Sequence, residues 1–386
     1  MARVAFVGIQ TTELLTFRRE MLRAMVRAGH EVLAVAPEDD PEVRDALAAM
    51  HVQFIRVPLR RAGINPLRDV GTVVSLTRTF RRFRPDAVLL SAVKPVAFGA
   101  LAARLAGVPV RAAMITGAGS ALTGGAGRGA RRRLLGALVR GLYRFGLSQV
   151  AIVFFQNPDD ELLFRDLRLV GSRQRLVRIA GSGIDLAEFP VAPLPPPPMT
   201  FLMVARLLRD KGLLEYIAAA GRVKKRYPAV RFQLLGPLDP NPESITAAQL
   251  ATIREEGTVE YLGAVADVRP FLAAAHVGVL PSYREGTPRS ILEAMATGRP
   301  IITTDAPGCR ETVEPGENGF RVPSRDVEAL ADAMTELLDH PDQLQSMGAA
   351  SRRLAETRFD VREVNAIILA AMGLLPDQAE SPLRLR

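Results

Sequence analysis

Residues 281–305, PSYREGTPRSILEAMATGRPIITTD, contain a polar loop, a predicted helix and a second predicted strand in one short stretch. The segment before them, His276–Leu280, is apolar enough to form a short buried strand, and Pro281 and Ser282 would end it. Thr287 is a suitable N-cap and Pro288 fits the first helical position. Apolar residues then recur at helical spacing, so the stretch predicts a strand–loop–helix–strand unit of an α/β sheet.

Two glutamates stand out in this unit: Glu285 in the loop and Glu293 in the helix. Open α/β sheets bind ligands at the carboxyl ends of their strands, and the free N–H groups of a helix N-terminus attract anions. Glu293 shares a helix face with Arg289, so its carboxylate is expected in a cleft, in solvent, or in an exposed i,i+4 ion pair. The two carboxylates fit recognition of hydroxyl groups on both sides of a phosphate.

Composition bounds the class of protein. A chain of 386 residues with 48% hydrophobic residues favours two domains with large cores. No apolar run approaches the ~18 residues of a membrane span, and the apolar start of the chain is too short for a signal peptide. Cys309 is the single cysteine, which excludes an internal disulfide. We expect a cytoplasmic enzyme.

The order of predicted elements indicates two doubly wound parallel sheets. The first half alternates helices, beginning with Glu13–Ala28, with strands at 3–9, 31–36, 52–57, 87–90, 110–115 and 150–155. The second half has strands at 200–205, 231–236, 258–262, 277–280 and 300–303, and closes with helices at 325–338, 341–357 and 361–372. Six prolines in residues 190–199 predict a stiff linker between the two domains. We therefore expect an α/β protein of two Rossmann-like domains with the active site in the cleft between them.

The positive charge belongs to the first half. Residues 1–199 hold 28 Lys and Arg against 16 Asp and Glu, and the remainder holds 22 against 25. A basic domain attracts nucleic acid, anionic lipid or a phosphorylated acceptor. Nucleic acid is the weakest of these, because the chain has no Trp, few other aromatic residues and no stacking motif.

A basic loop, Arg206–Lys211, follows the first strand of the second half. Fixed cations stabilise the negative charge that grows on a phosphate or diphosphate leaving group. Arg206 could bridge phosphate oxygens as a planar fork, and Lys211 could supply a point charge. Arg209 is the expected bystander, and a solvated basic loop is the alternative.

Taken together, Glu285 and Glu293, with seven residues between them, and Arg206 with Lys211, resemble the signature of family 4 retaining glycosyltransferases, which have the GT-B fold. The resemblance covers nearly the whole chain. It implies an acceptor-binding domain at 1–189, a linker at 190–199 and a nucleotide-sugar domain at 200–358. It further implies a helix at 359–376 that crosses back to the first domain, and a tail at 377–386.

The resemblance also implies roles for individual residues. Arg206 and Lys211 would hold the diphosphate, Glu285 the donor sugar and Glu293 the ribose. The loop that would also bind the diphosphate consists of Gly286, Thr287, Pro288 and Arg289. Two strand-end turns could contact the base or could be plain turns, and their residues are Gly236, Pro237 and Leu262.

Phe17 and Arg18 of the first predicted helix, together with the segments 61–67, 155–159 and 234–239, are similar to the subgroup that extends polyprenyl-diphosphate-linked sugars. The pattern of Thr116, Gly117 and Gly119 fits the acceptor-side loop of that subgroup. The resemblance thus implies a donor that is a hexose or N-acetylhexosamine linked to a nucleotide, UDP above all, and a lipid-linked sugar acceptor.

No metal and no further cofactor is expected. No Asp-x-Asp occurs, and with cations and a helix N-terminus at the diphosphate no Mg²⁺ is needed. We expect transfer with retention by a front-face path.

Arginines alternate with leucines over Arg128–Phe145, as in a basic amphipathic helix. Such a helix can lie on an anionic membrane, although a sheet-packed helix with a solvated basic face has the same pattern. The first reading predicts peripheral association with the inner face of the cell membrane. The main rival to a glycosyltransferase is a UDP-sugar epimerase of the same architecture, which would need no lipid-facing surface.

Overall fold

The computed structural model describes residues 1–375 apart from 60–65, 120–121, 123–129, 240 and 242–243. Contacts divide the chain into unit 1, Met1–Ser182 with Val361–Arg386, and unit 2, Gly183–Asp360. The predicted tail at 377–386 and residues 61–65 of the segment 61–67 lie outside the described residues.

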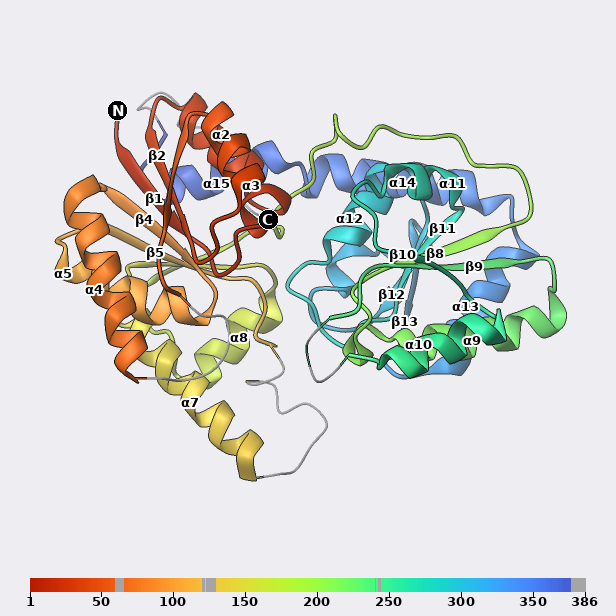
Figure 1. The fold of residues 1–386 in the computed structure, drawn as a ribbon. Coiled ribbons are helices and arrows are strands. Elements are labelled where there is room, and N and C mark those ends of the chain that lie inside the picture. The colour runs from red at the N-terminus through yellow and green to blue at the C-terminus, as the bar shows by residue number, and fades with distance from the viewer. Residues whose placement is uncertain (60–65, 120–121, 123–129, 240, 242–243, 376–386) are drawn as a thin grey trace. The chain divides into compact units, whose positions relative to one another are not determined.

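Unit 1 contains a seven-stranded parallel sheet in the order β3-β2-β1-β4-β5-β6-β7 (Figure 1). Its strands are β1 (Arg3–Val7), β2 (Glu31–Ala36), β3 (Val52–Arg56), β4 (Ala87–Ser91), β5 (Val110–Ile115), β6 (Ile152–Phe155) and β7 (Arg175–Arg178). Alternate residues of β1 enter opposite cores, with Val4 and Phe6 in one and Ala5 and Val7 in the other, because successive strand side chains point to opposite faces.

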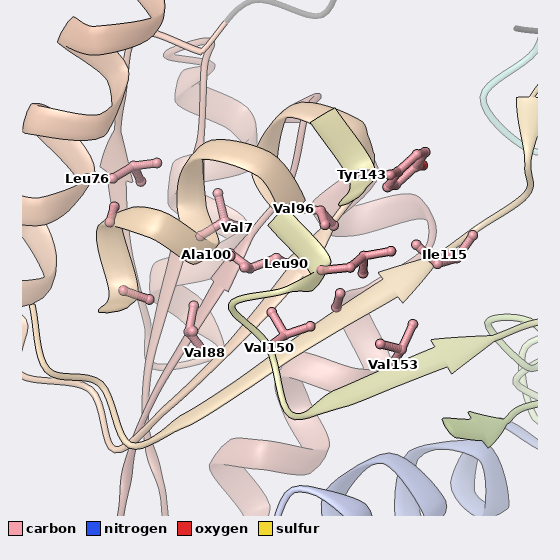
Figure 2. Packing of buried hydrophobic residues seen from close by; sticks show 14 of the residues in the cluster. Val7, Leu76, Val88, Leu90, Val96, Ala100, Ile115, Tyr143, Val150 and Val153 are labelled. Carbon is pink, nitrogen blue, oxygen red and sulfur yellow. The ribbon is translucent and has the colours of Figure 1, made fainter. Parts of the chain in front are cut away.

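Helices cover both faces of this sheet. They are α1 (Glu13–Thr16), α2 (Arg19–Arg27), α3 (Pro41–Ala49), α4 (Pro66–Phe83), the π-helical turn η1 (Pro95–Gly99), α5 (Ala100–Leu105), α7 (Ala130–Leu147), α8 (Pro158–Asp166) and α15 (Val361–Ala371). The cluster with Val4 and Phe6 includes buried residues of α2, α3 and α15. The cluster with Ala5 and Val7 includes buried residues of α4, α5, α7 and α8, and Figure 2 shows part of it.

The C-terminal helix belongs to the first unit. Val364 and Ile368 of α15 are buried beside Met21 and Leu22 of α2, and His30 Nε2 lies 2.6 Å from the Leu374 carbonyl oxygen. The expected crossing of this helix back to the first domain is therefore confirmed.

One predicted helix of unit 1 is divided. The sequence predicts a single helix over Glu13–Ala28, whereas the structure has α1, a break at Phe17 and Arg18, and then α2. The break turns the Arg18 side chain inward, where it is buried against Glu13 and lies 6.0 Å from the centre of the Phe6 ring.

Unit 2 contains a six-stranded parallel sheet in the order β10-β9-β8-β11-β12-β13. Its strands are β8 (Thr200–Val204), β9 (Arg231–Leu235), β10 (Glu260–Gly263), β11 (Val277–Leu280), β12 (Ile301–Thr304) and β13 (Gly319–Val322). The helices of this unit are η2 (Arg209–Lys211), α9 (Leu213–Arg226), α10 (Ala247–Glu256), α11 (Arg269–Ala274), α12 (Arg289–Ala296), η3 (Arg310–Thr312), α13 (Val327–Asp339) and α14 (Gln343–Arg358).

The proline-rich segment 190–199 is part of unit 2. Ala192 donates its N–H to the Thr297 carbonyl, and the fully buried Arg299 donates to the carbonyls of Pro193, Leu272 and Ala273. Burial lowers the pKa of Arg299 to about 10. The chain passes between the units earlier than the expected linker, at Ser182–Gly183, and again at Asp360–Val361.

Candidate active site

The strand order of unit 2 places two loops together. The chain runs from β8 outward to β9 and β10, and then returns to β11 on the other side of β8. Ligands of open α/β sheets bind at such a reversal, outside the carboxyl ends of the strands. The loops that leave β8 and β11 there carry Arg206–Lys211 and Pro281–Pro288, the two segments that the sequence singles out.

A glycine brings these loops close to each other. Gly212 follows η2 with a φ of 72°. A Cβ at this position would lie 2.0 Å from the Pro281 carbonyl oxygen, so no other residue fits there. The loops are also tied by Tyr283, which donates its N–H to the Asp210 carbonyl at 2.8 Å, and by Ser282, whose hydroxyl donates to the same carbonyl at 3.1 Å.

Lys211 and Glu285 meet where these loops join. Lys211 Nζ donates to Glu285 Oε1 at 2.5 Å, and the two side chains are only 16% and 13% exposed. The Glu285 backbone N–H donates to the Pro307 carbonyl at 2.9 Å, which fixes the loop that carries the carboxylate. The structure thus joins two predicted site residues, one from each loop, in a single charged pair.

Arg206 has an acidic partner that the sequence reading gave no role. Its Nη1 atom donates to Asp239 Oδ2 at 2.5 Å, and Asp239 is largely buried whereas Arg206 remains partly exposed. Asp239 follows β9, the strand next to β8, and this position after a strand is the signal that could have identified it.

Glu293 lies in α12 and pairs with Arg289. Arg289 Nε donates to Glu293 Oε1 at 2.9 Å, and both side chains are mostly buried. Burial raises the pKa of the Glu293 carboxyl, and the charge of Arg289 lowers it in part. The predicted i,i+4 ion pair therefore exists, but it is buried rather than exposed.

The start of α12 differs from the prediction by one residue. Pro288, not Thr287, is the N-cap, because the Pro288 backbone is extended and its carbonyl accepts the first helical hydrogen bonds, from Ile291 and Leu292. Proline has no N–H, so within Gly286–Arg289 it cannot donate to a diphosphate.

Gly236 and Pro237 lie beside the Arg206 loop. The Pro237 carbonyl accepts the Leu207 N–H at 3.0 Å. Gly236 has a φ of 147°, and a Cβ there would lie 1.9 Å from the Ala205 carbonyl oxygen. Leu262 is half-buried in β10, which β9 separates from β8. Gly236 therefore has a clear packing role, and the base contacts of all three residues remain predictions.

Tyr283 of the β11 loop has two charged partners, Glu215 and Arg325, that were not predicted from the sequence. Tyr283 donates its hydroxyl to Glu215 Oε1 at 2.6 Å, and the guanidinium carbon of Arg325 lies 4.5 Å from the centre of the tyrosine ring. Burial and then the Glu215 carboxylate raise the pKa of Tyr283 to about 12. The hydroxyl and the ring of Tyr283 thus each have a charged partner, two residues before Glu285 in the same loop.

The predicted acceptor-side residues belong to unit 1. Thr116, Gly117 and Gly119 lie in the first four residues after β5, with φ angles of 133° at Gly117 and 66° at Gly119. Within the described ranges, no group of three or more His, Cys, Asp or Glu could hold a metal ion.

Solved structures with the same fold define the class. A sucrose-phosphate synthase from Thermosynechococcus elongatus superimposes with a TM-score of 0.81 at 21% identity, over 96% of this chain and 98% of that one. Anabaena HepE in complex with UDP-glucose gives 0.76 at 18% identity, over 97% and 100%. Together with the two parallel sheets, these matches define a two-domain α/β protein of the GT-B fold.

Family models identify the chain. The model described as "Glycosyl transferase 4-like domain" matches residues 15–181, and the one described as "Glycosyl transferases group 1" matches residues 198–340. The protein belongs to this glycosyltransferase family and is a glycosyltransferase.

Two curated relatives differ in how much of the chain they match: one matches most of it and the other about half. The N,N'-diacetylbacillosaminyl-diphospho-undecaprenol alpha-1,3-N-acetylgalactosaminyltransferase of Campylobacter jejuni is 27% identical over 87% of this chain and 89% of its own length. The putative colanic acid biosynthesis glycosyltransferase WcaL of Salmonella typhimurium is 30% identical over 54% of this chain and 53% of its own. Neither an epimerase nor a nucleic-acid-binding protein is favoured by these matches.

Proposed function

We propose that the protein transfers a hexose or N-acetylhexosamine from a nucleotide donor, UDP-linked, to a polyprenyl-diphosphate-linked sugar. The observation that carries the proposal is the Lys211–Glu285 pair at the strand-order reversal of unit 2. A cation and a carboxylate held together there match the two parts of a nucleotide sugar, its anionic diphosphate and its hydroxyl-bearing sugar.

In the proposed complex the donor separates this pair. Lys211 turns to the diphosphate, joined by Arg206 and by the N–H groups of Gly286, Thr287 and Arg289. Glu285 accepts hydrogen bonds from the donor sugar, and Glu293 accepts them from the ribose diol. Lys211 thus exchanges Glu285 for the diphosphate, and Glu285 exchanges Lys211 for the sugar hydroxyls. Neither buried charge is left without a polar partner.

The proposed transfer is a front-face substitution with retention. The bond between the anomeric carbon and the diphosphate oxygen breaks, and the acceptor oxygen bonds to the same face of that carbon. The acceptor proton passes to the departing phosphate oxygen. Lys211 and Arg206 stabilise the charge that grows on the diphosphate, so the step needs no metal ion and no cofactor.

The acceptor side rests on the Campylobacter jejuni relative, whose name specifies a sugar on diphospho-undecaprenol. Thr116, Gly117 and Gly119 of unit 1 are proposed to contact this acceptor. An acceptor anchored in a bilayer requires the enzyme to work at the membrane surface.

Helix α7 is proposed as the part that meets the membrane at its inner, cytoplasmic face. It covers most of the predicted segment 128–145; residues 128–129 and the side chains of 130–132 lie outside the described ones. Leu134 is 71% exposed, and Leu135, Phe145, Arg133 and Arg144 are exposed as well. Apolar and cationic side chains on one helix are suited to anionic lipid. Among the described helices none is both long and apolar enough to cross a bilayer.

The test combines a UDP-sugar panel with diacetylbacillosamine-diphospho-undecaprenol and related polyprenyl-diphosphate hexosamines in detergent micelles, with and without EDTA. We expect transfer with α-retention that EDTA leaves unchanged. Interconversion of the UDP-sugar without acceptor would instead show an epimerase. Loss of transfer in EDTA would contradict metal independence, and flotation with anionic liposomes that shows no binding would contradict the role of α7.

A further inference from the structure

Unit 1 has its own reversal of strand order, between β1 and β4. After β1 the chain buries Leu14 and Leu22 in the hydrophobic cluster on one face of the sheet. After β4 it buries Val96 and Ala100 in the cluster on the opposite face. The two connections therefore diverge to opposite faces of the sheet. This divergence makes the crevice in which doubly wound sheets bind ligands.

Glu13 points its carboxylate across this crevice. Glu13 is the first residue of α1, which follows β1. Its Oε1 nevertheless accepts a hydrogen bond from the hydroxyl of Ser91, the last residue of β4, at 3.3 Å. Arg18 Nη2 lies 3.6 Å from the same oxygen, and the Arg18 side chain is buried. The carboxylate is thus held between the two diverging connections by a hydroxyl and a cation.

A role in helix stability alone does not account for this arrangement. An acidic residue in the first turn of a helix usually interacts with the helix dipole. However, α1 has only four residues. The side chain of Glu13 contacts Ser91 at the end of β4 and Arg18, the residue just before α2, so its contacts lie outside its own helix.

The second carboxylate oxygen is available. Both contacts of Glu13 use Oε1, and within the part of the chain that the structure describes Oε2 has no hydrogen-bond partner. Oε2 lies on the side of Gly8, 3.8 Å from the position that a Cβ would take there, so the absent side chain leaves room beside it. The Glu13 side chain is 14% exposed, which leaves it within reach of a ligand.

Ala92 supports a functional use of the crevice. It directly follows Ser91 and has a φ of 76°, a left-handed conformation that costs a non-glycine residue energy. Such strain is concentrated at sites where the chain is held for binding or catalysis.

We propose that Glu13 Oε2 accepts a hydrogen bond from a hydroxyl of the acceptor sugar and so positions that sugar for attack on the donor. This inference rests on the proposed function, since it needs a sugar acceptor in unit 1. A carboxylate is suited to the task because a hydrogen bond to a charged acceptor is stronger than one to a neutral group. Glu13 takes no proton in the reaction, so its effect falls on acceptor binding.

The test is Glu13→Gln, with Glu20→Gln as the matched control. The Glu20 side chain is also 14% exposed and also pairs with arginines, Arg23 at 2.6 Å and Arg27 at 2.9 Å, but it belongs to α2. Acceptor KM, donor KM and UDP affinity are measured with diacetylbacillosamine-diphospho-undecaprenol, or with whichever polyprenyl-diphosphate hexosamine the wild-type chain uses.

We expect Glu13→Gln to raise the acceptor KM about tenfold or more while donor KM and UDP affinity stay as in the wild type. Glu20→Gln should change none of the three. Acceptors that lack single hydroxyls add a readout that a structural role would not move: removal of the contacted hydroxyl should cost the wild type about tenfold and Glu13→Gln almost nothing. Glu13→Asp keeps the negative charge but has a shorter side chain, which moves the carboxylate away from the acceptor. It should also raise the acceptor KM, and it replaces Glu13→Gln in the test if the glutamine variant does not fold.

An acceptor KM within twofold of wild type in a folded Glu13 variant would overturn the inference and leave the proposed function intact. Absence of transfer by the wild-type chain with every acceptor would overturn both.

Discussion

Lys211 Nζ lies 2.5 Å from Glu285 Oε1, and this contact joins the loop after β8 to the loop after β11. The two residues are 74 positions apart in the sequence and meet only because β8 and β11 are neighbours at the reversal of strand order. Both side chains are mostly buried, so their charges attract each other with little screening by solvent. In the absence of donor each charge therefore keeps the other in place.

Lys211→Ala should lower kcat/KM by about 10²-fold, equivalent to about 3 kcal/mol, because the growing charge on the diphosphate loses a fixed cation. Steady-state transfer assays measure the loss. Lys225→Ala, which removes an exposed lysine of α9 in the same unit, should leave the rate unchanged. Turnover near the wild-type level in Lys211→Ala would place the diphosphate site elsewhere.

Arg206→Ala should have a similar effect, about 10²-fold, and Arg209→Ala should have almost none. Both arginines are exposed and lie in the same loop, but only Arg206 is anchored by a carboxylate, that of Asp239. The comparison thus separates a positioned cation from the general basicity of the loop. Equal losses in the two variants would favour general basicity.

Much of the sheet architecture was predictable because central strands are buried on both sides. The bounds of β2, β5 and β11 match the apolar runs predicted from the sequence, and every residue of β11 is buried. The predictions missed β7 and β13, both at sheet edges. No residue of β7 is fully buried, and in β13 only the two end residues are. The two strands include Arg175, Arg178 and Arg321, so they carry no continuous apolar signal.

Pairings between loops were less predictable than the residues that form them. Arg206, Lys211, Glu285 and Glu293 could be selected by position and charge, but the contact of Arg206 with Asp239 depends on which strands are neighbours. The buried setting of Glu293 was misjudged for a related reason: helical spacing gives the face of a side chain, not what covers that face.

Glu293→Gln should weaken UDP binding about tenfold, because the neutral amide is a weaker acceptor for the ribose diol than a carboxylate. Titration calorimetry with UDP and 2′-deoxy-UDP measures this. The wild type should prefer UDP, and the variant should lose that preference. An exposed control, Glu317→Gln, should bind as the wild type does. A variant that keeps the full preference for UDP would remove Glu293 from the ribose site.

Lys94 and Asp69 form a mostly buried ion pair in unit 1, with Lys94 Nζ 3.0 Å from Asp69 Oδ1. Lys94→Met should destabilise unit 1 by about 3 kcal/mol because it leaves a buried carboxylate without its cation. The double variant Lys94→Met, Asp69→Leu should recover most of this loss. Urea unfolding followed by circular dichroism measures both, and a single variant as stable as the wild type would show that solvent already compensates the pair.

Cys309 offers a chemical probe of the same region as Lys211 and Glu285. Burial, and after it the negative charge of Glu285, raises the pKa of its thiol to about 12. The thiol is protonated below its pKa, so at pH 8 about one molecule in 10⁴ carries the reactive thiolate. An aromatic disulfide reagent should therefore label the folded protein very slowly at pH 8, whereas the unfolded chain should react fast with one equivalent, since Cys309 is the only cysteine. Glu285→Gln should quicken labelling only modestly, because burial is the larger cause of the shift. Rapid stoichiometric labelling of the folded wild type would contradict the buried setting of Cys309 beside the β11 loop.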